Sequence, residues 1–469
     1  MKTPLTRRSL LGGAALGGAA WLLRDLRRAF AASTAAVDPS TAPYLIFCAF
    51  EGGWDQLLCL DPRDATKYGA SGPIHAAYER IEDATTKAVL AQSNGTGLVT
   101  PAGSNITFGP AVGRLSGAFA DLCVVRGLSM DTLTHEVGRR YMLTGKLPRG
   151  VSASGSALST AAVGQLGDAE PIPNLVVGLE TYNEGQPNFA SGLTVTRSQD
   201  ILVVLKRLGI ALPPSVQAEL DAYAWSEKCG ERLLDGEGAV TTWLDSREKA
   251  VVLASGDLAA HFDFSTKPSA QIQALYDHFG LSKLSNAQLT AALSGGPGQA
   301  MIAAQAITRG VSRAVSIRLA NNIDHHDDDW ASTHATALRS GFEALADLIA
   351  YLKATPDAKG KPFWDRCVVV ACSDFARAPT LNARGGRDHH LASSCLLAGK
   401  GVRGNVVVGG TDDAAFSARP CDVATGLPSV SGVKLRPADV HATLLKAAGL
   451  GYAHLENQSP QLISAALRT

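Results

Sequence analysis

The chain has 469 residues, of which 46% are hydrophobic and only 18% are charged. This apolar content excludes a mainly disordered protein, because it supplies enough surface for a large buried core. The 43 basic and 43 acidic residues balance. We therefore expect no nucleic-acid partner, since such proteins normally carry a basic excess. Beyond the N-terminus, no uncharged apolar run reaches the roughly 18 residues that a membrane-spanning helix needs, so we expect no integral membrane partner.

The N-terminus has the pattern of an export signal. Arg7 and Arg8 precede residues 9–23, a weakly apolar run rich in Ala and Gly. Paired arginines before such a run resemble the twin-arginine motif. We therefore expect residues 1–32 to be a twin-arginine-type signal peptide that is read by the twin-arginine export machinery. The mature protein, residues 33–469, would then be periplasmic or extracellular. An ordinary secretory signal or an uncleaved anchor is the alternative.

Short apolar runs rich in Val, Ile, Leu and Cys predict strands that are covered on both faces. In chain order these runs are residues 44–50, 122–125, 175–177, 314–319 and 366–372. Helical patterns occur at residues 108–121, 334–353 and 438–448. Strands that alternate with helices predict an α/β/α sandwich with a largely parallel sheet.

The middle of the chain has a different pattern. Between residues 194 and 310 the apolar spacing is helical, and no strong strand is evident. The expected helices are residues 201–208, 216–232, 240–253, 270–279 and 300–308. We therefore expect a helical insertion at about 194–310 within the α/β domain.

Polar and ionisable side chains follow four of the predicted strands, at the point where each strand ends. They are Glu51 and Asp55, then Thr134 and His135, then Asp324 and His326, and finally Asp374 and Arg377, with His389 soon after. Ligands of an open parallel sheet bind beyond the carboxyl ends of its strands, so we expect these side chains to share one rim. Mixed Asp and His sets suit Zn, Mn or Fe, whereas carboxylate sets suit Mg or Ca. The pattern predicts a divalent metal that acts as a Lewis acid.

Each of these residues also has an ordinary structural interpretation. Asp55 lies in a Gly-rich turn, where Asp commonly caps the turn or a helix. Asp374 follows a strand, which is a common N-cap position, and Arg377 could pair with a nearby acid. The functional interpretation depends on the convergence of all of them at one sheet edge.

The motifs at these positions resemble those of a known family. The C-terminal ones are Ser373-Asp374-Phe375-Ala376-Arg377, then Asn382, then Gly385-Gly386-Arg387-Asp388-His389. They are similar to S-E-F-G-R-T…N…G-T-D-H, a pattern of an exported bacterial family called domain of unknown function 1501. Its G-G-x-D, H…T-G and G-W-D-T-H motifs correspond to Gly52-Gly53-Trp54-Asp55, His135…Thr144-Gly145 and Asn322-Ile323-Asp324-His325-His326. The motifs occur in the family's order and span nearly the whole mature chain.

That family is similar to the alkaline phosphatase, sulfatase and phosphoglycerate mutase superfamily. The resemblance implies metals at the carboxyl edge of the sheet and a small anionic ester of phosphate or sulfate as substrate. It implies that Asp324, His326 and His389 bind one metal. It further implies that Glu51 or Asp55 binds the other together with Asp374.

The resemblance also implies the catalytic roles. His135 or Thr134 would face the reacting atom, and Arg377 would contact the substrate anion bidentately. The chain departs from the superfamily at Phe375, where a metal-binding His is usual. It also has His135 at the position of the mutase Ser nucleophile. Thr134 and Thr132 are nearby substitutes for that hydroxyl, and a metal ligand, a general base or a covalent nucleophile are the alternative roles for His135 itself.

The sequence thus predicts an exported metal-dependent hydrolase of phosphate or sulfate esters, with Zn, Mn, Mg or Ca as the metal. The departures from the superfamily motivate a second hypothesis, a non-catalytic envelope binding or assembly protein on a degenerate hydrolase fold. A metal-assisted hydrolase of other bonds is a third, minor hypothesis.

Overall fold

The computed structural model describes residues 38–468, except residues 39, 70, 206–213, 216–217, 220–221 and 223–256. The chain divides into a short unit, Met1–Ala42, and a large unit, Pro43–Thr469. The expected signal peptide lies outside the described residues. The fold described below is that of the large unit.

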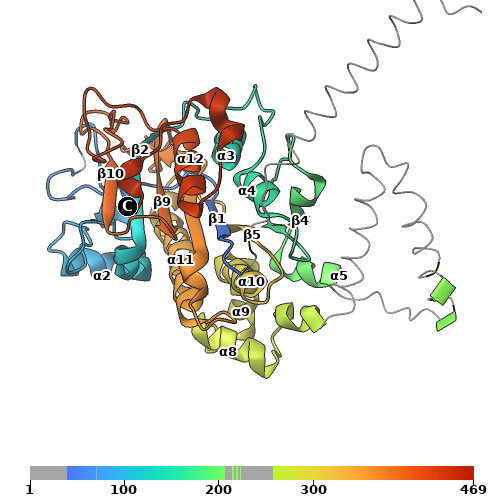
Figure 1. The fold of residues 1–469 in the computed structure, drawn as a ribbon. Helices are drawn as coiled ribbons and strands as arrows, with labels where there is room; N and C mark the ends of the chain where they lie inside the picture. The colour runs from blue at the N-terminus through green and yellow to red at the C-terminus, as the bar shows by residue number, and fades with distance from the viewer. Residues whose placement is uncertain are drawn as a thin grey trace, which may run out of the picture. The chain divides into compact units, whose positions relative to one another are not determined.

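Eight strands of the described chain form one sheet, in the order β10-β2-β9-β6-β1-β5-β3-β4 (Figure 1). Their bounds are β1 Tyr44–Phe50, β2 Leu122–Ser129, β3 Asn174–Val177, β4 Leu193–Val195, β5 Ala314–Ala320, β6 Cys367–Ser373, β9 Ala392–Gly399 and β10 Val406–Gly409. Only β9 runs antiparallel to its neighbours, β2 and β6. All other neighbouring strands are parallel, which confirms the largely parallel sheet.

The five strands predicted from the sequence are present, but β4, β9 and β10 were not predicted. The strand β9 has the sequence ASSCLLAG, which lacks the β-branched and aromatic residues that favour strands. All eight of its residues are nevertheless buried, because β9 lies between β2 and β6. The short strand β4 corrects the expectation that the chain is helical from residue 194 onward.

Helices cover both faces of the sheet, so the predicted α/β/α sandwich is confirmed. On one face, α10 (Gly296–Thr308) and α11 (Ala335–Ala354) pack on β5, and the ring of Phe50 in β1 lies 4.6 Å from that of Phe342 in α11. On the other face, α4 (Leu158–Leu166) contacts β1 and β5. There α3 (His135–Thr144) and α12 (Pro437–Ala448) lie side by side against β6 (Figure 1). Side chains alternate between the faces of β1, so Phe50 points toward α11 whereas Phe47 lies beside Met142 and Leu143 of α3.

The helix expected at residues 108–121 is wrong in its first part. A 3-10 helix covers only Gly113–Asp121, and Phe108 instead pairs with Val99 in an isolated bridge. Gly109 lies so close to the chain before it that a Cβ there would be 2.4 Å from the carbonyl carbon of Leu58. This close approach, rather than helical periodicity, decides the local conformation.

After β4, the described part of the middle segment is mainly helical. It contains α5 (Ile201–Leu205), α8 (Ala270–His278), α9 (Asn286–Ser294) and α10. The helices expected at residues 216–232 and 240–253 lie almost entirely outside the described residues. Among the described helices, none has both the length and the apolar composition needed to cross a bilayer.

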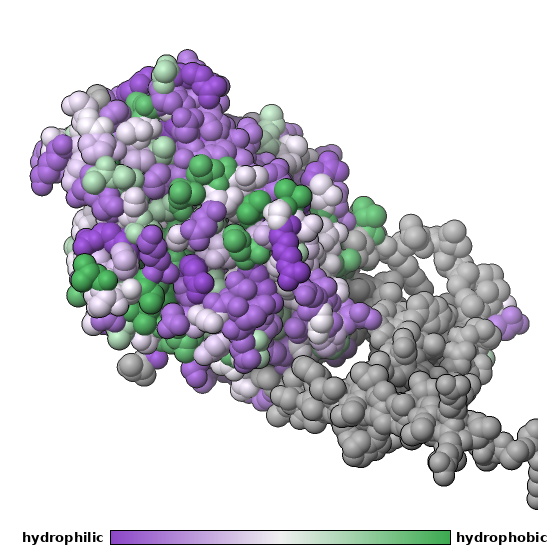
Figure 2. Space-filling view, turned by 90° about the horizontal axis from the view of Figure 1, so that it is seen from above, coloured by the Kyte–Doolittle hydropathy of each residue, from purple (hydrophilic) through white to green (hydrophobic). Residues whose placement is uncertain are grey.

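The remaining elements are short and lie in the connections between the longer ones. They are α2 Ala84–Gln92, the two-residue strands β7 Ala376–Arg377 and β8 His389–His390, a π-helical turn Trp330–His334, and the 3-10 helices Tyr78–Arg80, Asn188–Ala190, Ser198–Asp200, Asp257–Phe262, Phe363–Arg366, Ala453–Gln458 and Ser464–Ala466. Figure 2 shows one face of the molecule, where hydrophobic residues form small groups among hydrophilic ones. Such scattered groups are ordinary for a folded surface.

One testable contribution to stability is the carboxylate of Asp83, which joins α2 to α11. It caps α2 by accepting from the N–H of Thr86 at 2.7 Å and pairs with Arg339 of α11. Burial raises the pKa of Asp83, but the hydrogen bonds from Arg339 and Thr86 outweigh it and lower the pKa to about 2. The contribution to stability is therefore complete above the ordinary Asp pKa and disappears as the pH falls toward about 2.

We expect Asp83→Ala to lower the free energy of unfolding by about 1–2 kcal/mol near neutral pH. Denaturant unfolding at several pH values measures this change. The difference in the free energy of unfolding between variant and wild type should become smaller below about pH 4. Glu82→Ala, at an exposed neighbouring residue, is the control and should change little. A deficit that does not depend on pH, or one shared by the control, would contradict this role of Asp83.

Candidate metal centre

The side chains of the candidate site come together because several chain segments end or begin at one edge of the sheet. Asp324 and His326 follow β5, Asp374 follows β6, and His135 is the first residue of α3, after β2. His389 comes just before β9. Since β9 is antiparallel to its neighbours, its first residues lie at the edge where the parallel strands end. His389 therefore reaches this rim by the direction of a strand that the sequence analysis missed.

Close packing of α3 on β6 brings His135 to the rim. A Cβ at Gly138, one turn after His135, would lie 2.2 Å from the carbonyl oxygen of Asp374. Only glycine permits this approach. Arg377 and His389 are register partners in the two-stranded sheet β7–β8, which places the two side chains beside one another.

Three imidazole nitrogens surround one carboxylate oxygen at this rim. The Nε2 atoms of His135, His326 and His389 lie 3.2, 3.0 and 3.4 Å from Oδ1 of Asp324. The Nε2 atom of His389 is also 3.1 Å from that of His135 and 2.9 Å from that of His326. We call these four residues the histidine cluster. Their side chains are 20 to 42% exposed, so a ligand can reach them from solvent.

The other ring nitrogen of each histidine faces a hydrogen-bond acceptor. Nδ1 of His135 lies 2.5 Å from Asp374, Nδ1 of His326 lies 2.9 Å from Asp388, and Nδ1 of His389 lies 2.6 Å from the carbonyl oxygen of Leu133. A carboxylate or carbonyl can only accept, so each Nδ1 carries the proton. In the neutral rings, Nε2 then presents a lone pair. Metal-binding histidines are oriented by partners of this kind.

Nε2 of His326 accepts from Nη1 of Arg377 at 3.2 Å, but the Nε2 lone pairs of His135 and His389 face each other at 3.1 Å and repel unless a proton or a cation lies between them. Imidazole nitrogens with a carboxylate oxygen are donors that suit a transition metal. The residues present therefore fit a divalent cation held by the histidine cluster. Within the described part of the chain, His135, Asp324 and His389 form such a group of three ligands, with their ligand atoms within 4.8 Å of one another.

The electrostatics of the cluster favour the metal-binding forms of Asp324 and His389. Burial raises the pKa of Asp324, but the hydrogen bond and charge of Arg377 outweigh it and hold this pKa well below the usual range. Burial, together with the charge of Arg377, lowers the pKa of His389 despite its hydrogen bond to Leu133. Asp324 is therefore ionised and His389 neutral near pH 7. Burial also lowers the pKa of His135, but the hydrogen bond and charge of Asp374 raise it overall, so protons compete with a metal for this ligand.

Arg377 lies behind the cluster, with its side chain fully buried. Its Nε donates to Gly53 O at 3.0 Å, and Nη2 donates to Asp324 and to Gly52 O. Its Nη1 donates to Arg387 O at 3.1 Å and to Nε2 of His326 at 3.2 Å. The N–H donors of the guanidinium are therefore already bound to acceptors within the protein. The expected bidentate contact of Arg377 with a substrate anion does not fit these surroundings. Its charge instead keeps Asp324 ionised.

The structure does not bring Glu51 and Asp55 into the cluster. Asp55 is 1% exposed, and its carboxylate pairs with Arg387 at 2.8 Å and accepts from the indole N–H of Trp330 at 3.0 Å. The carboxylate of Glu51 accepts from Arg318 at 2.9 Å. The metal-ligand roles expected for Glu51 and Asp55 thus do not fit their surroundings, since both carboxylates already neutralise arginines.

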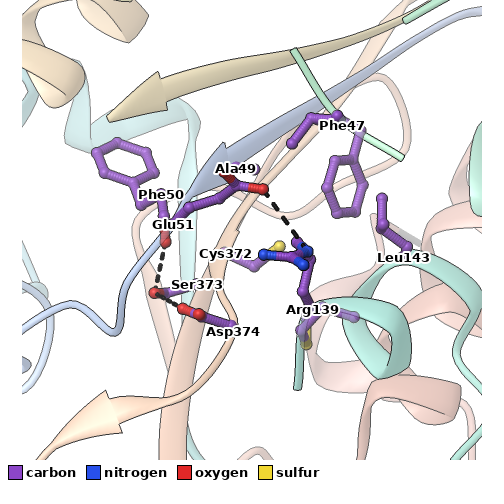
Figure 3. A pocket seen from close by; sticks show the side chains of 11 residues that line it. Phe47, Ala49, Phe50, Glu51, Arg139, Leu143, Cys372, Ser373 and Asp374 are labelled. Carbon is purple, nitrogen blue, oxygen red and sulfur yellow. Dashed lines mark hydrogen bonds and ion pairs between the residues drawn. The ribbon is translucent and has the colours of Figure 1, made fainter. Parts of the chain in front are cut away.

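Glu51 borders a small pocket on the α3 face of the sheet (Figure 3). Arg139, one turn after His135, reaches across this pocket toward Glu51, with the two charged groups 3.9 Å apart. The pocket adjoins the cluster only through Asp374, and its other walls are mainly apolar. It therefore lies behind the histidine cluster rather than at its ligand side.

Asp374 acts on the cluster through His135 rather than as a direct member. Its Oδ1 accepts from the N–H of Gly53 at 2.7 Å and from the hydroxyl of Ser373 at 2.9 Å, while Oδ2 binds Nδ1 of His135. The buried ring of Phe375 lies 4.4 Å from the rings of both His135 and His389. At the position where the resemblance predicts a second-metal histidine, the chain thus has an apolar side chain that packs the cluster in place.

Two functional neighbours were missed by the sequence analysis. Asp388 orients His326 and accepts from Asn382 at 3.0 Å, while the carbonyl of Leu133 orients His389. The position of Asp388 beside His389 was a signal that could have indicated the carboxylate. Nothing in the sequence indicates a backbone carbonyl. Thr134, just before α3, is exposed, and its side chain does not cap that helix.

Comparisons with known proteins place this geometry in context. No curated protein matches the sequence. Among solved structures, Ps i-CgsB in complex with k-i-k-neocarrahexaose is 12% identical, with 90% of this chain and 75% of that chain covered and a TM-score of 0.36. The PsFucS1 sulfatase from Pseudoalteromonas sp. is 11% identical, with 88% of this chain and 68% of that chain covered and a TM-score of 0.33. The alkaline phosphatase from the Antarctic bacterium TAB5 is 13% identical, with 87% of this chain and 99% of that chain covered and a TM-score of 0.32.

A family model described as "Protein of unknown function (DUF1501)" matches residues 42–458. This range contains every residue of the histidine cluster and nearly all of the large structural unit. The chain therefore belongs to the DUF1501 family.

Proposed function

We propose that this protein is a metal-dependent hydrolase of phosphate or sulfate esters. The observation that carries the proposal is the convergence of three Nε2 atoms on one carboxylate oxygen, with each imidazole oriented through its Nδ1. We assign the metal to His135, His326, His389 and Asp324. A donor set rich in imidazole favours Zn over Mg or Ca. When bound, the cation would supply Lewis-acid activation of the ester or of a nucleophile.

The charge at the rim supports an anionic substrate. Asp324 is already paired with Arg377, so the charge of a divalent cation would remain largely available to attract an anion. The N-terminus of α3 lies at the cluster, because His135 is its first residue. Helix N-termini carry partial positive charge and free N–H groups that favour oxyanions such as phosphate and sulfate.

We assign Thr134 as the residue that faces the reacting atom. It directly precedes His135 and is exposed, and its hydroxyl does not cap α3. A Thr hydroxyl can act as a nucleophile when it is activated by a base or a metal. On the pattern at Arg7 and Arg8, we also propose that the protein is exported through the twin-arginine machinery and acts outside the cytoplasm.

A second candidate function is a non-catalytic binding or assembly role. The observation that favours it is the buried Phe375 ring against His135 and His389, at the position of the expected second-metal histidine. A single retained centre can stabilise a fold or bind a ligand without turnover.

Metal content gives the first test of the proposal. We expect the purified chain to hold about one equivalent of a divalent transition metal, and His389→Ala or His326→Ala to weaken binding at least about 100-fold. Elemental analysis and competition with a chelator measure this. His390→Ala is the matched control, since the ring of His390 contacts the Ala415 carbonyl outside the cluster. A folded wild type that binds no metal under any loading condition would overturn the proposal.

Turnover separates the two candidate functions. With metal bound, we expect hydrolysis of an aryl phosphate or an aryl sulfate, and we expect Thr134→Val to lower kcat at least about 100-fold. Thr132→Val, at a neighbouring hydroxyl that accepts from the N–H of Thr134, is the control. Full activity of Thr134→Val would show that the Thr134 hydroxyl takes no part in the reaction. No turnover of either ester by the metal-loaded wild type would favour the binding role.

A further inference from the structure

Two ligand-bearing segments, the one before His389 and the one at His326, share a buried hydrogen-bonded network behind the cluster. We infer that Arg387, Asp55, His334 and His325 are positioning residues that hold His326 and His389 at metal-binding distance. This inference rests on the proposed metal centre. It gives Asp55 a role that the sequence pattern did not predict.

Arg387 anchors the segment that carries His389. Its guanidinium is fully buried and pairs with Asp55 at 2.8 Å. It also donates to the carbonyl oxygens of Ala378 at 3.0 Å, His75 at 2.6 Å and Ala76 at 3.1 Å. These three acceptors belong to two segments far apart in the chain, so Arg387 joins the loop before His389 to both.

Asp55 connects this anchor to the segment that carries His326. Oδ2 of Asp55 forms the ion pair with Nε of Arg387 and accepts a hydrogen bond from the indole N–H of Trp330. The guanidinium of Arg387 lies 4.7 Å from the centre of the Trp330 ring. The backbone N–H of Asp55 donates to Nε2 of His334 at 3.1 Å. The turn after β1 and the start of α11 are thereby held together.

The two buried histidines, His334 and His325, extend the network as a chain of hydrogen bonds in which each group donates to the next. Because Nε2 of His334 accepts, its Nδ1 carries the proton and donates to Nδ1 of His325 at 2.9 Å. His325 then carries its proton on Nε2, which donates to the hydroxyl of Thr333 at 2.9 Å. That hydroxyl donates in turn to the carbonyl of Asp329 at 2.8 Å. Every polar atom along this path has a partner while both rings remain neutral.

The network closes on itself, because the backbone N–H of Arg387 donates to the carbonyl of His325 at 3.1 Å. His326 is the next residue after His325, and His389 is two residues after Arg387. The same network thus fixes the two backbones from which these ligands project. A metal site requires its ligands to be held within about 0.5 Å of the binding geometry, and supporting contacts of this kind hold them there.

A role in stability alone does not explain the network well. A buried ion pair costs desolvation and commonly stabilises no more than well-packed apolar residues would. The planar guanidinium forks toward Asp55 and three carbonyls at once, a geometry that a lysine ammonium cannot reproduce. Positioning of the ligands accounts for both the charge and the shape of Arg387.

The test compares Arg387→Lys and Asp55→Asn with Arg126→Lys in the full chain, with Co²⁺ and Zn²⁺ as probes. Arg126 is a matched control, since it donates to the carbonyls of Leu60 and Thr107 and pairs with Asp61, outside the network. Competition with a chelator gives metal affinity, the visible spectrum of bound Co²⁺ reports ligand geometry, and circular dichroism reports folding.

We expect Arg387→Lys and Asp55→Asn to remain folded, to weaken metal binding by about 10–100-fold and to shift the Co²⁺ spectrum. Arg126→Lys should lower the unfolding temperature without either change. If Arg387→Lys or Asp55→Asn does not fold, Trp330→Phe, which removes one donor to Asp55, should produce the same spectral shift. Unchanged affinity and spectra in folded variants, or equal changes in Arg126→Lys, would overturn the positioning role. A wild type that binds neither ion would instead refute the metal centre on which the inference depends.

Discussion

The structure at the rim depends on the orientation of three imidazole rings through their Nδ1 atoms. Asp374, Asp388 and the Leu133 carbonyl each accept a hydrogen bond from one ring, which leaves the three Nε2 atoms directed at Asp324. Without a cation or a proton this arrangement would be repulsive. The protein stabilises it by packing the rings against Phe375 and by placing the charge of Arg377 beside Asp324. The rim thus has an arrangement that a cation at its centre would stabilise.

The carboxylates near the rim fall into three roles according to their surroundings. Asp324 is 42% exposed and directed at the histidines, so it can bind a metal. Asp374 and Asp388 orient rings from behind. Asp55 is buried and paired with Arg387, and Glu51 neutralises Arg318, so both act on the scaffold. Similar residue types at similar distances from strand ends therefore do different work, and burial and pairing decide which.

The arginines are divided in the same way. Arg377 and Arg387 are fully buried, and their guanidinium groups bind carbonyls and carboxylates of the protein. Neither is available to a substrate. If the substrate is anionic, as we propose, it must be attracted by the metal and by the N-terminus of α3. This leaves the centre dependent on its cation for affinity as well as for chemistry.

Local patterns in the sequence determined the five parallel strands, the long helices α11 and α12, and the motifs that place the chain in its family. These features depend on runs of apolar residues and on short-range spacing, which a linear sequence records. The rim residues Asp324, His326 and His389 could be identified from the same motifs. Tertiary structure alone decided the direction of β9, which brings His389 to the rim, and the partners of Asp55 and Arg377. Those outcomes depend on contacts between residues 50 to more than 300 positions apart, and the burial that selects a pairing exists only once the sheet and its two helix layers have assembled.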